Sequence, residues 1–139
     1  MKFIALIVLT LSLITTGTAQ NATDRPAELQ KGVSKAKRID VEEFDKLRGA
    51  KTNTVLDVRT EKEFKAGHIP GALNIDVNAA DFDQKAGQLD KSKTYLVHCA
   101  AGVRSAKACN KMESMGFTNL YDLAPGFRGW EKAGKPVEK

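Results

Sequence analysis

The chain has few residues of the kinds that build disulfide scaffolds or metal centres. Its 139 residues include two cysteines and two histidines. Two cysteines are too few for a disulfide framework, and they lack the paired spacing of a zinc site. Two histidines are too few for a metal centre with several histidine ligands. We therefore expect neither a metal ion nor another cofactor.

The chain also lacks the size of a multidomain protein and the composition of a disordered or fibrous one. It is 42% hydrophobic and 28% charged, close to the globular average. A length of this order fits one domain. The formal net charge of +5 comes from lysines scattered along the chain, without a basic stripe or interleaved aromatic residues. We therefore expect modest attraction for small anions and no nucleic-acid binding.

A long apolar run occurs only at the N-terminus, where Lys2 precedes the uncharged stretch from Phe3 to Ile14. A membrane-spanning helix needs roughly 20 apolar residues, whereas the apolar part of a signal peptide has about 7–15. Gly17 and Ala19 follow at the −3 and −1 positions of a cleavage site. We predict a signal peptide over residues 1–19, with a buried N-terminal helix or a retained anchor as the alternatives.

A signal peptide implies an exported protein, periplasmic if the source is a Gram-negative bacterium. No cysteine lies near the predicted cut, so neither a lipoprotein anchor nor another stable membrane anchor is expected. Residues 20–37 are polar and show little periodicity, which indicates a tether or loosely packed lead-in. We assign residues 38–139 to the folded domain.

Short β-rich runs alternate with helical patterns along this domain. Such alternation predicts βαβ units and a parallel sheet covered by helices on both faces. The loops that follow the strands then lie along one edge, where ligands usually bind. Strands are predicted at 53–58, 72–75, 94–97 and 119–123. Helices are predicted at 41–48, 60–67, 80–89, 105–115 and 127–133, with Asp40 and Thr60 as the N-caps of the first two.

The segment from Val97 to Ser105 contains the residue types expected of a catalytic loop: a cysteine, a glycine and an arginine. We expect it to leave a buried strand and to enter the N-terminus of a helix. In such a loop successive backbone N–H groups turn inward, and the positive end of the helix dipole adds to them. The loop would therefore hold an anion.

Cys99 is the predicted nucleophile of this loop. We expect its sulfur at the mouth of the cradle, where the same field lowers the pKa of a thiol. Gly102 allows a backbone conformation that other residues resist, and the small Ala100 and Ala101 leave room for a bound group. Arg104 ends the loop with a permanent charge. The alternative is a buried cysteine in an ordinary strand-to-helix turn.

Three segments resemble the rhodanese family and occur in the order typical of it. Leu56–Ala72 (LDVRTEKEFKAGHIPGA) resembles its N-terminal signature, Cys99–Arg104 (CAAGVR) its active-site loop, and Gly126–Trp130 (GFRGW) its C-terminal motif. Pro125 stands where the family commonly has glycine. The sequence is thus similar to single-domain rhodaneses, here of an exported, periplasmic type.

This resemblance implies a three-layer α/β fold, with a central parallel sheet flanked by helices, and sulfurtransferase activity. Cys99 would attack the outer sulfur of an anionic donor such as thiosulfate, release sulfite and keep the sulfur as a persulfide. A thiol, a protein acceptor or, in an assay, cyanide would then remove it. The residues implied to bind the donor and stabilise the persulfide are Ala100, Ala101, Gly102, Val103, Arg104 and Ser105.

Asp57, Arg59 and His68 are predicted to support the site without reacting. Asp57 and Arg59 flank one residue at a strand end, so their side chains can point the same way and form a structural ion pair. His68 is expected to hold a turn. His98 precedes the nucleophile on a strand, so its side chain faces the opposite way and is expected to be packed or hydrogen-bonded.

We predict mainly structural roles for Cys109 and for the motif Gly126–Trp130. Cys109 lies two to three helical turns beyond Cys99, too far for a disulfide, and is predicted to be a buried apolar side chain. Trp130 is expected in the core or in a pocket wall. Arg128 is a candidate neighbour of the substrate cleft.

Two other functions compete with sulfur transfer. Phosphatases and arsenate reductases on a similar scaffold have five residues between cysteine and arginine, whereas this loop has the four residues 100–103. The shorter loop suits a single sulfur better than a tetrahedral phosphate. The other alternative is a non-catalytic binding module or a sulfur carrier that acts only with a protein partner.

Overall fold

A parallel β-sheet organises residues 34–139, which are the residues that the computed structural model describes. Its strand order is β1-β5-β4-β2-β3, and every neighbouring pair is parallel. The signal peptide predicted for residues 1–19, and the predicted lead-in before residue 34, lie outside the described residues. The strands are β1 (Lys37–Ile39), β2 (Asn53–Asp57), β3 (Leu73–Asn74), β4 (Thr94–His98) and β5 (Leu120–Leu123).

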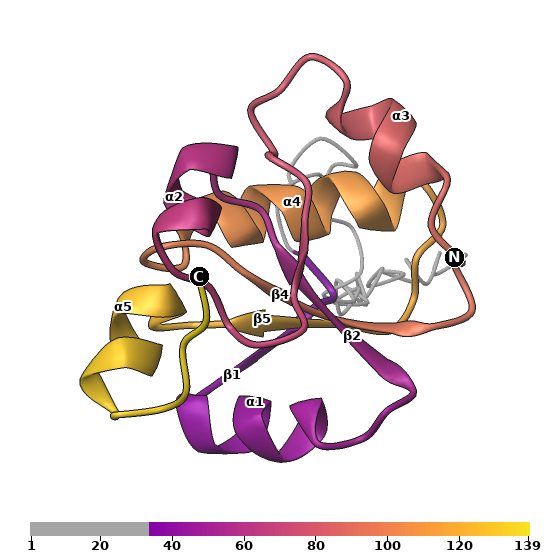
Figure 1. The fold of residues 1–139 in the computed structure, drawn as a ribbon. Helices are drawn as coiled ribbons and strands as arrows, with labels where there is room; N and C mark the ends of the chain where they lie inside the picture. The colour runs from indigo at the N-terminus through magenta and orange to yellow at the C-terminus, as the bar shows by residue number, and fades with distance from the viewer. Residues whose placement is uncertain (1–33) are drawn as a thin grey trace, which may run out of the picture. The chain divides into compact units, whose positions relative to one another are not determined.

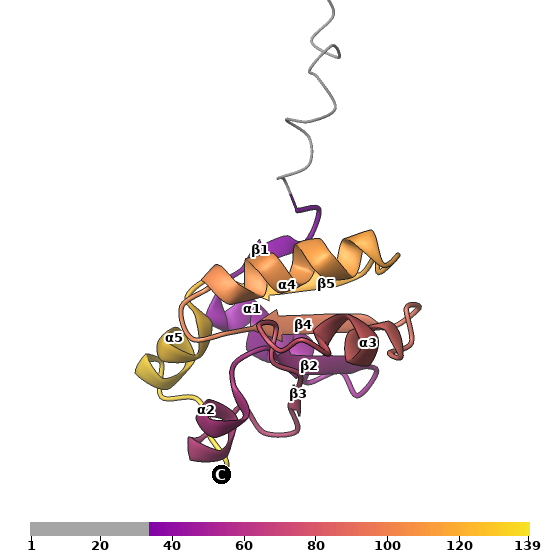
Figure 2. The ribbon, with the colours of Figure 1, turned by 90° about the horizontal axis from the view of Figure 1, so that it is seen from above.

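Helices cover both faces of this sheet. Figures 1 and 2 show α1 on one face and α3 with α4 on the other, while α2 and α5 lie at one end of the strands. This arrangement confirms the predicted three-layer α/β fold. Within residues 34–139, no helix has the length and apolar character needed to cross a membrane. The helices are α1 (Val41–Arg48), α2 (Glu61–Ala66), α3 (Phe82–Gly87), α4 (Val103–Ser114) and α5 (Gly126–Lys132).

The helices begin where the sequence supplies capping side chains. Asp40 caps α1, because its Oδ1 accepts the Glu43 N–H at 2.9 Å. Thr60 and Glu63 form a capping box at the start of α2, each side chain accepting the backbone N–H of the other. Both caps were predicted. The second one positions the Glu63 carboxylate, which also pairs with Arg104 of the active-site loop.

The core lies in two apolar clusters, one on each face of the sheet. Leu56 and Val97 belong to the cluster beneath α3 and α4. Their neighbours Val55 and Leu96 belong to the cluster against α1 and α5. Because both faces are buried, the central strands read as continuous apolar runs. This packing fixes the strand ends from which the loop of interest leaves.

The observed elements differ from the predicted ones mainly at their ends. β1 was not predicted, since two of its three residues are exposed and only Ile39 is buried. It begins at Lys37, which the sequence placed in the lead-in. Ala36 also belongs to the folded unit, since its N–H donates to Glu113 Oε1 at 2.6 Å. α4 begins at Val103, two residues before the predicted start, because the turn into it is already complete at Gly102.

Candidate active site

The loop that contains Cys99 leaves the carboxyl end of β4, beside the end of β2. Asp57 and His98 are register partners there, and the Val58 N–H donates to the His98 carbonyl at 2.9 Å. The loops that follow these two strands are therefore held next to each other. This brings the predicted N-terminal signature and the predicted active-site loop to one edge of the sheet.

The first two carbonyls of the loop are held by the N-terminus of α5. The Phe127 N–H donates to the Cys99 carbonyl at 2.7 Å, and the Arg128 N–H donates to the Ala100 carbonyl at 3.0 Å. These bonds satisfy N–H groups that a helix cannot satisfy within its own first turn. Because these two carbonyls point toward α5, the N–H groups that follow them in the loop can face the sulfur.

The Cys99 sulfur lies inside the curve of the loop. The Gly102 N–H donates to Sγ at 3.2 Å, and Sγ lies 3.5 Å from the Ser105 hydroxyl oxygen, which accepts from the thiol and donates to the thiolate. Burial acts to raise the pKa of Cys99, but hydrogen bonds from Ser105 and from the N–H groups of Ala101 and Gly102 outweigh it and bring the pKa below its ordinary value. The loop therefore favours the thiolate, as predicted.

The depth of this sulfur differs from the prediction. The sequence placed it at the mouth of the cradle, whereas Cys99 is only 1% exposed. It lies at the floor because the loop closes over it from Gly102 to the first turn of α4. A group that reacts with Sγ must therefore enter the loop itself, which suits a narrow reactant.

Two glycines make this closed loop possible. Gly102 has φ +85°, and a Cβ atom there would collide with the Ala124 carbonyl oxygen. Gly126, at the start of α5, has φ +63°, and a Cβ atom there would collide with the backbone of Ala100. Left-handed φ values and close backbone approach both require glycine. The loop and the start of α5 thus pack together through backbone atoms.

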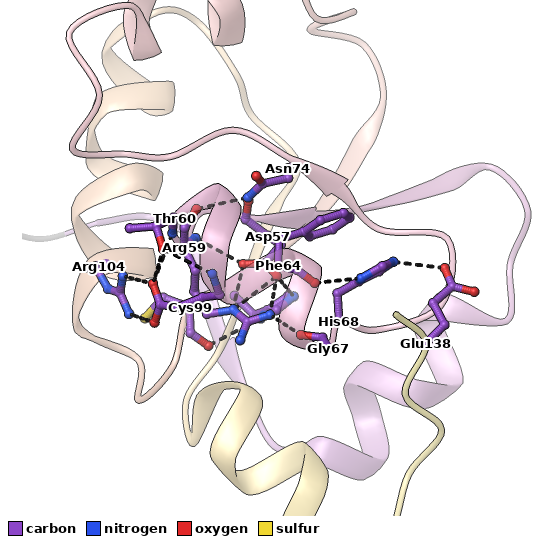
Figure 3. A network of polar contacts seen from close by, with 12 residues as sticks. Asp57, Arg59, Thr60, Phe64, Gly67, His68, Asn74, Cys99, Arg104 and Glu138 are labelled. Atoms are coloured by element: carbon purple, nitrogen blue, oxygen red, sulfur yellow. Dashed lines mark hydrogen bonds and ion pairs between the residues drawn. The ribbon is translucent and has the colours of Figure 1, made fainter.

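Arg104, predicted to bind an anionic donor, is paired with Glu63 of α2. Its two outer nitrogens donate to the two carboxylate oxygens, each at 2.8 Å (Figure 3). The hydrogen bonds from Arg104 lower the pKa of Glu63 to about 2. This two-point ion pair ties the active-site loop to α2 and fixes the direction of the guanidinium. An anionic donor would use the N–H groups of Arg104 that face away from Glu63.

Asp57 and Arg59 form the predicted ion pair, and both are buried. Arg59 Nη2 lies 2.6 Å from Asp57 Oδ2 and also donates to the Gly67 carbonyl at 2.8 Å, which ties the end of β2 to the end of α2 (Figure 3). His68 continues this support: its Nδ1 lies 2.9 Å from the Phe64 carbonyl oxygen. The ion pair and the His68 contact are thus observed, and the supporting role of these three residues stays a prediction.

His98 and Cys109 are buried, as predicted. His98 Nδ1 lies 3.2 Å from the Cys99 carbonyl oxygen, and no hydrogen bond among residues 34–139 joins its ring to the sulfur. Burial lowers the pKa of His98 and keeps it neutral. Cys109 is a free thiol, and burial raises its pKa well above the usual range. Neither residue shares the geometry that activates Cys99.

A cavity of about 260 Å³ adjoins the loop between α2 and α5. Arg128 borders it, as suggested from the sequence, whereas Trp130 is fully buried in the core. No group of three or more histidine, cysteine, aspartate or glutamate side chains among residues 34–139 is arranged to hold a metal ion. The residues lining the cavity include Arg59, Glu63, Gly67, Ala100, Phe127 and Arg128.

Three residues at the loop were not singled out from the sequence as site residues. The sequence could have indicated Glu63, because it lies three residues after Thr60, the spacing of a capping box at the start of α2. Arg38 donates to the Gly102 carbonyl at 3.3 Å and to Asp122 Oδ2 at 3.0 Å. Neither Arg38 nor Asp122 had a signal, since their meeting depends on the pairing of β1 with β5.

Comparison with known proteins agrees with this geometry. The profile of the family described as "Rhodanese-like domain" matches residues 40–133, well over half of the chain. The chain belongs to the rhodanese-like domain family. A rhodanese-related protein from Thermoplasma volcanium has a similar crystal structure, with a TM-score of 0.65 and 32% identity over 73% of this chain and 97% of that one.

Several rhodanese relatives are named for sulfur transfer. The chain is 32% identical over 102 residues to "Thiosulfate sulfurtransferase GlpE" of Shewanella oneidensis, covering 73% of this chain and 98% of the relative. It is 39% identical over 101 residues to the GlpE protein of Pseudomonas fluorescens, covering 70% and 87%. "Putative sulfur carrier protein YrkF" of Bacillus subtilis is 30% identical over 93 residues, 66% of this chain and 49% of that protein. The relatives thus include named sulfurtransferases, a putative sulfur carrier and proteins named "tRNA uridine(34) hydroxylase".

Proposed function

We propose that this rhodanese is a thiosulfate sulfurtransferase that works through a persulfide on Cys99. One observation carries the proposal: the Cys99 sulfur accepts an inward N–H in a loop whose first carbonyls are already bound to α5. Such a loop stabilises negative charge at one point. Names of relatives that are similar over most of their length support the same donor.

The reaction has two displacement steps. In the first, the Cys99 thiolate attacks the outer sulfur of thiosulfate, a new S–S bond forms, and sulfite leaves with the electron pair of the broken bond. In the second, a thiol or cyanide attacks the outer sulfur of the persulfide, and Cys99 leaves as a thiolate. Both steps keep negative charge on sulfur within the loop, where the N–H groups of Ala101, Gly102 and Ser105 lie.

The depth of the sulfur supports a narrow reactant. Cys99 is 1% exposed, so the attacking and the leaving sulfur must share the space inside a loop of four residues. A terminal sulfur atom projects from the rest of thiosulfate and needs little width. A tetrahedral phosphate would need several oxygens inside the loop, so we do not favour phosphatase or arsenate-reductase activity.

Mass spectrometry of the intact protein tests this proposal. After treatment with thiosulfate, the wild type should gain the mass of one sulfur atom, and the gain should be absent in Cys99→Ser. Cys109→Ser is the matched control, because it removes the other buried thiol and should still load. If the wild type never gains sulfur, the proposal is wrong. Hydrolysis of a phosphate ester without sulfur loading would favour the phosphatase alternative.

A partner-dependent sulfur carrier is the second candidate, and one observation favours it. Val103 is 78% exposed on the loop that encloses Cys99, which places an apolar side chain where a protein acceptor would dock. A carrier would load with sulfur but turn over poorly with cyanide or small thiols. Comparing the rate of loading with the rate of turnover separates the carrier from the enzyme.

We also propose that the protein is exported, with residues 1–19 removed. The proposal rests on the apolar run and small residues at the N-terminus. Mass determination of the protein purified from its source would test it, because export with cleavage predicts an N-terminus at Gln20. A chain that retains residues 1–19 would contradict it.

A further inference from the structure

His98 is a fully buried imidazole at the end of β4, next in the chain to the nucleophile. Its ring packs edge-on to Phe44, with ring centroids 6.2 Å apart, and stacks on Phe127 at 6.0 Å. Both aromatic rings belong to the cluster against α1 and α5, whereas the Cys99 side chain belongs to the cluster on the opposite face of the sheet. An effect of His98 on the sulfur must therefore pass through the backbone.

Nδ1 of His98 makes a contact of this kind. It lies 3.2 Å from the Cys99 carbonyl oxygen, which also accepts the Phe127 N–H at 2.7 Å. A carbonyl oxygen has two lone pairs and can accept two hydrogen bonds. This carbonyl is therefore held from two sides, by a side chain of β4 and by the backbone of α5.

The second ring nitrogen decides which tautomer makes this contact. Nε2 lies 3.7 Å from Oδ2 of Asp57 and has no hydrogen-bond partner among residues 34–139. Arg59 already donates to that carboxylate oxygen at 2.6 Å and offsets its charge (Figure 3). A proton on Nε2 would lack a hydrogen bond and would leave the Nδ1 lone pair facing the Cys99 carbonyl oxygen. A proton on Nδ1 donates to that oxygen instead, so this tautomer is the favoured one.

We propose that His98, as the Nδ1–H tautomer, is a positioning residue for sulfur transfer that holds the Cys99 carbonyl away from the reacting sulfur. The inference rests on the proposed function and adds a residue on which its nucleophile depends. The carbonyl accepts from His98 and Phe127, while the sulfur accepts from Gly102. The negative end of a peptide dipole lies at its carbonyl oxygen, so rotation of this peptide toward the sulfur would oppose the thiolate.

Nitrogen-15 NMR of the His98 ring in the wild type tests the tautomer directly. Its two signals are assigned by their absence from the spectrum of His98→Asn. At neutral pH we expect Nδ1 to carry the proton and Nε2 to have the shift of an unprotonated ring nitrogen. A proton on Nε2, or averaging between the two tautomers, would overturn the inference. This measurement needs no substitution at His98 to report on the wild-type ring.

Two substitutions of His98 separate the hydrogen bond from packing. Asparagine keeps an N–H donor one bond from Cγ, where Nδ1 stands, whereas leucine places a methyl group there. Thiolate formation is followed by ultraviolet absorbance, as the difference between each protein and its Cys99→Ser form. We expect His98→Asn to titrate as the wild type and His98→Leu to titrate about half a pH unit higher. Equal midpoints in the two variants would overturn the positioning role.

Phe44→Leu is the matched control for packing. It removes an aromatic neighbour of the His98 ring and leaves the contact between Nδ1 and the carbonyl in place. It should lower the urea midpoint and leave the Cys99 titration unchanged. A shift as large as that of His98→Leu would mean that packing alone accounts for the effect and would overturn the inference.

Sulfur loading is measured on the same samples by mass spectrometry. A wild type that has the Nδ1–H tautomer and the expected titrations but never gains sulfur would defeat the proposed function, and the contact of His98 with the loop would stand. A wild type that loads with sulfur but carries its His98 proton on Nε2 would defeat only the positioning role.

Discussion

The buried His98 makes folding stability depend on pH in a window that few other groups share. Its side chain is fully buried, and burial lowers its pKa, so the folded protein keeps it neutral. The unfolded chain protonates it below a pKa of about 6.5. Since the unfolded state then binds more protons, stability is full above that value and falls as the pH drops below it. One extra proton gives a slope of at most about 1.4 kcal/mol per pH unit.

Between pH 7.0 and pH 5.5 this linkage removes about 1.3 kcal/mol from the free energy of unfolding, if His98 stays neutral in the folded state throughout. Urea unfolding at the two pH values measures the loss. The carboxylates with lowered pKa, such as Glu63 and Asp45, add their own losses only at more acidic pH, because their ordinary values are 4.5 and 3.8. Asp122, whose pKa burial raises, acts with the opposite sign, so the contribution of His98 is obtained from the comparison of variants.

The chain has two histidines, which allows a matched control. His98→Gln should reduce the loss between the two pH values by about 1.3 kcal/mol, whereas His68→Gln, which keeps His98, should retain this contribution, whatever each variant does to stability at pH 7.0. The pH difference is compared within each variant, so packing changes at the substituted site cancel. An equal loss in the wild type and in His98→Gln would refute the reasoning.

Three further predictions concern the loop. Cys99→Ala should abolish sulfur transfer and leave the circular dichroism spectrum unchanged, since no other thiol has the inward N–H contact; residual transfer would contradict this. Gly102→Ala should destabilise the protein by about 2 kcal/mol or more, because φ +85° is strained for alanine and its Cβ meets the Ala124 carbonyl; unchanged urea unfolding would contradict it. Arg104→Ala should raise the KM for thiosulfate by about tenfold through loss of a charged donor, and an unchanged KM would refute that role.

Local sequence signals predicted most of the elements that position the site. Apolar runs indicated the central strands, and the caps at Asp40 and Thr60 marked where α1 and α2 begin. The left-handed backbone conformation at Gly102 was expected, because glycine adopts it more easily than other residues. These features depend on residues close in the sequence, so their physical causes are visible without the fold.

The parts that were missed depend on contacts between distant residues. β1 is stabilised by pairing with β5, and its own three residues carry no apolar pattern. The depth of Cys99 follows from how tightly the loop closes. Pro125, where the family commonly has glycine, is a local exception: its ring lies against Gly129, one helical turn further on, where a Cβ atom would collide with it.

The electrostatic environment that favours the Cys99 thiolate does not arise from the loop sequence alone. A loop can present N–H groups to its centre only if its carbonyls are directed elsewhere and have partners there, since buried carbonyls must be satisfied. Two of these partners are N–H groups of α5, and a third is Arg38 of β1, which lies outside the matched family region. Arg38 also pairs with Oδ2 of the buried Asp122 at 3.0 Å. The same side chain thus ties the loop to β5, so substitutions at Arg38 should change the loop geometry and the pKa of Cys99 together.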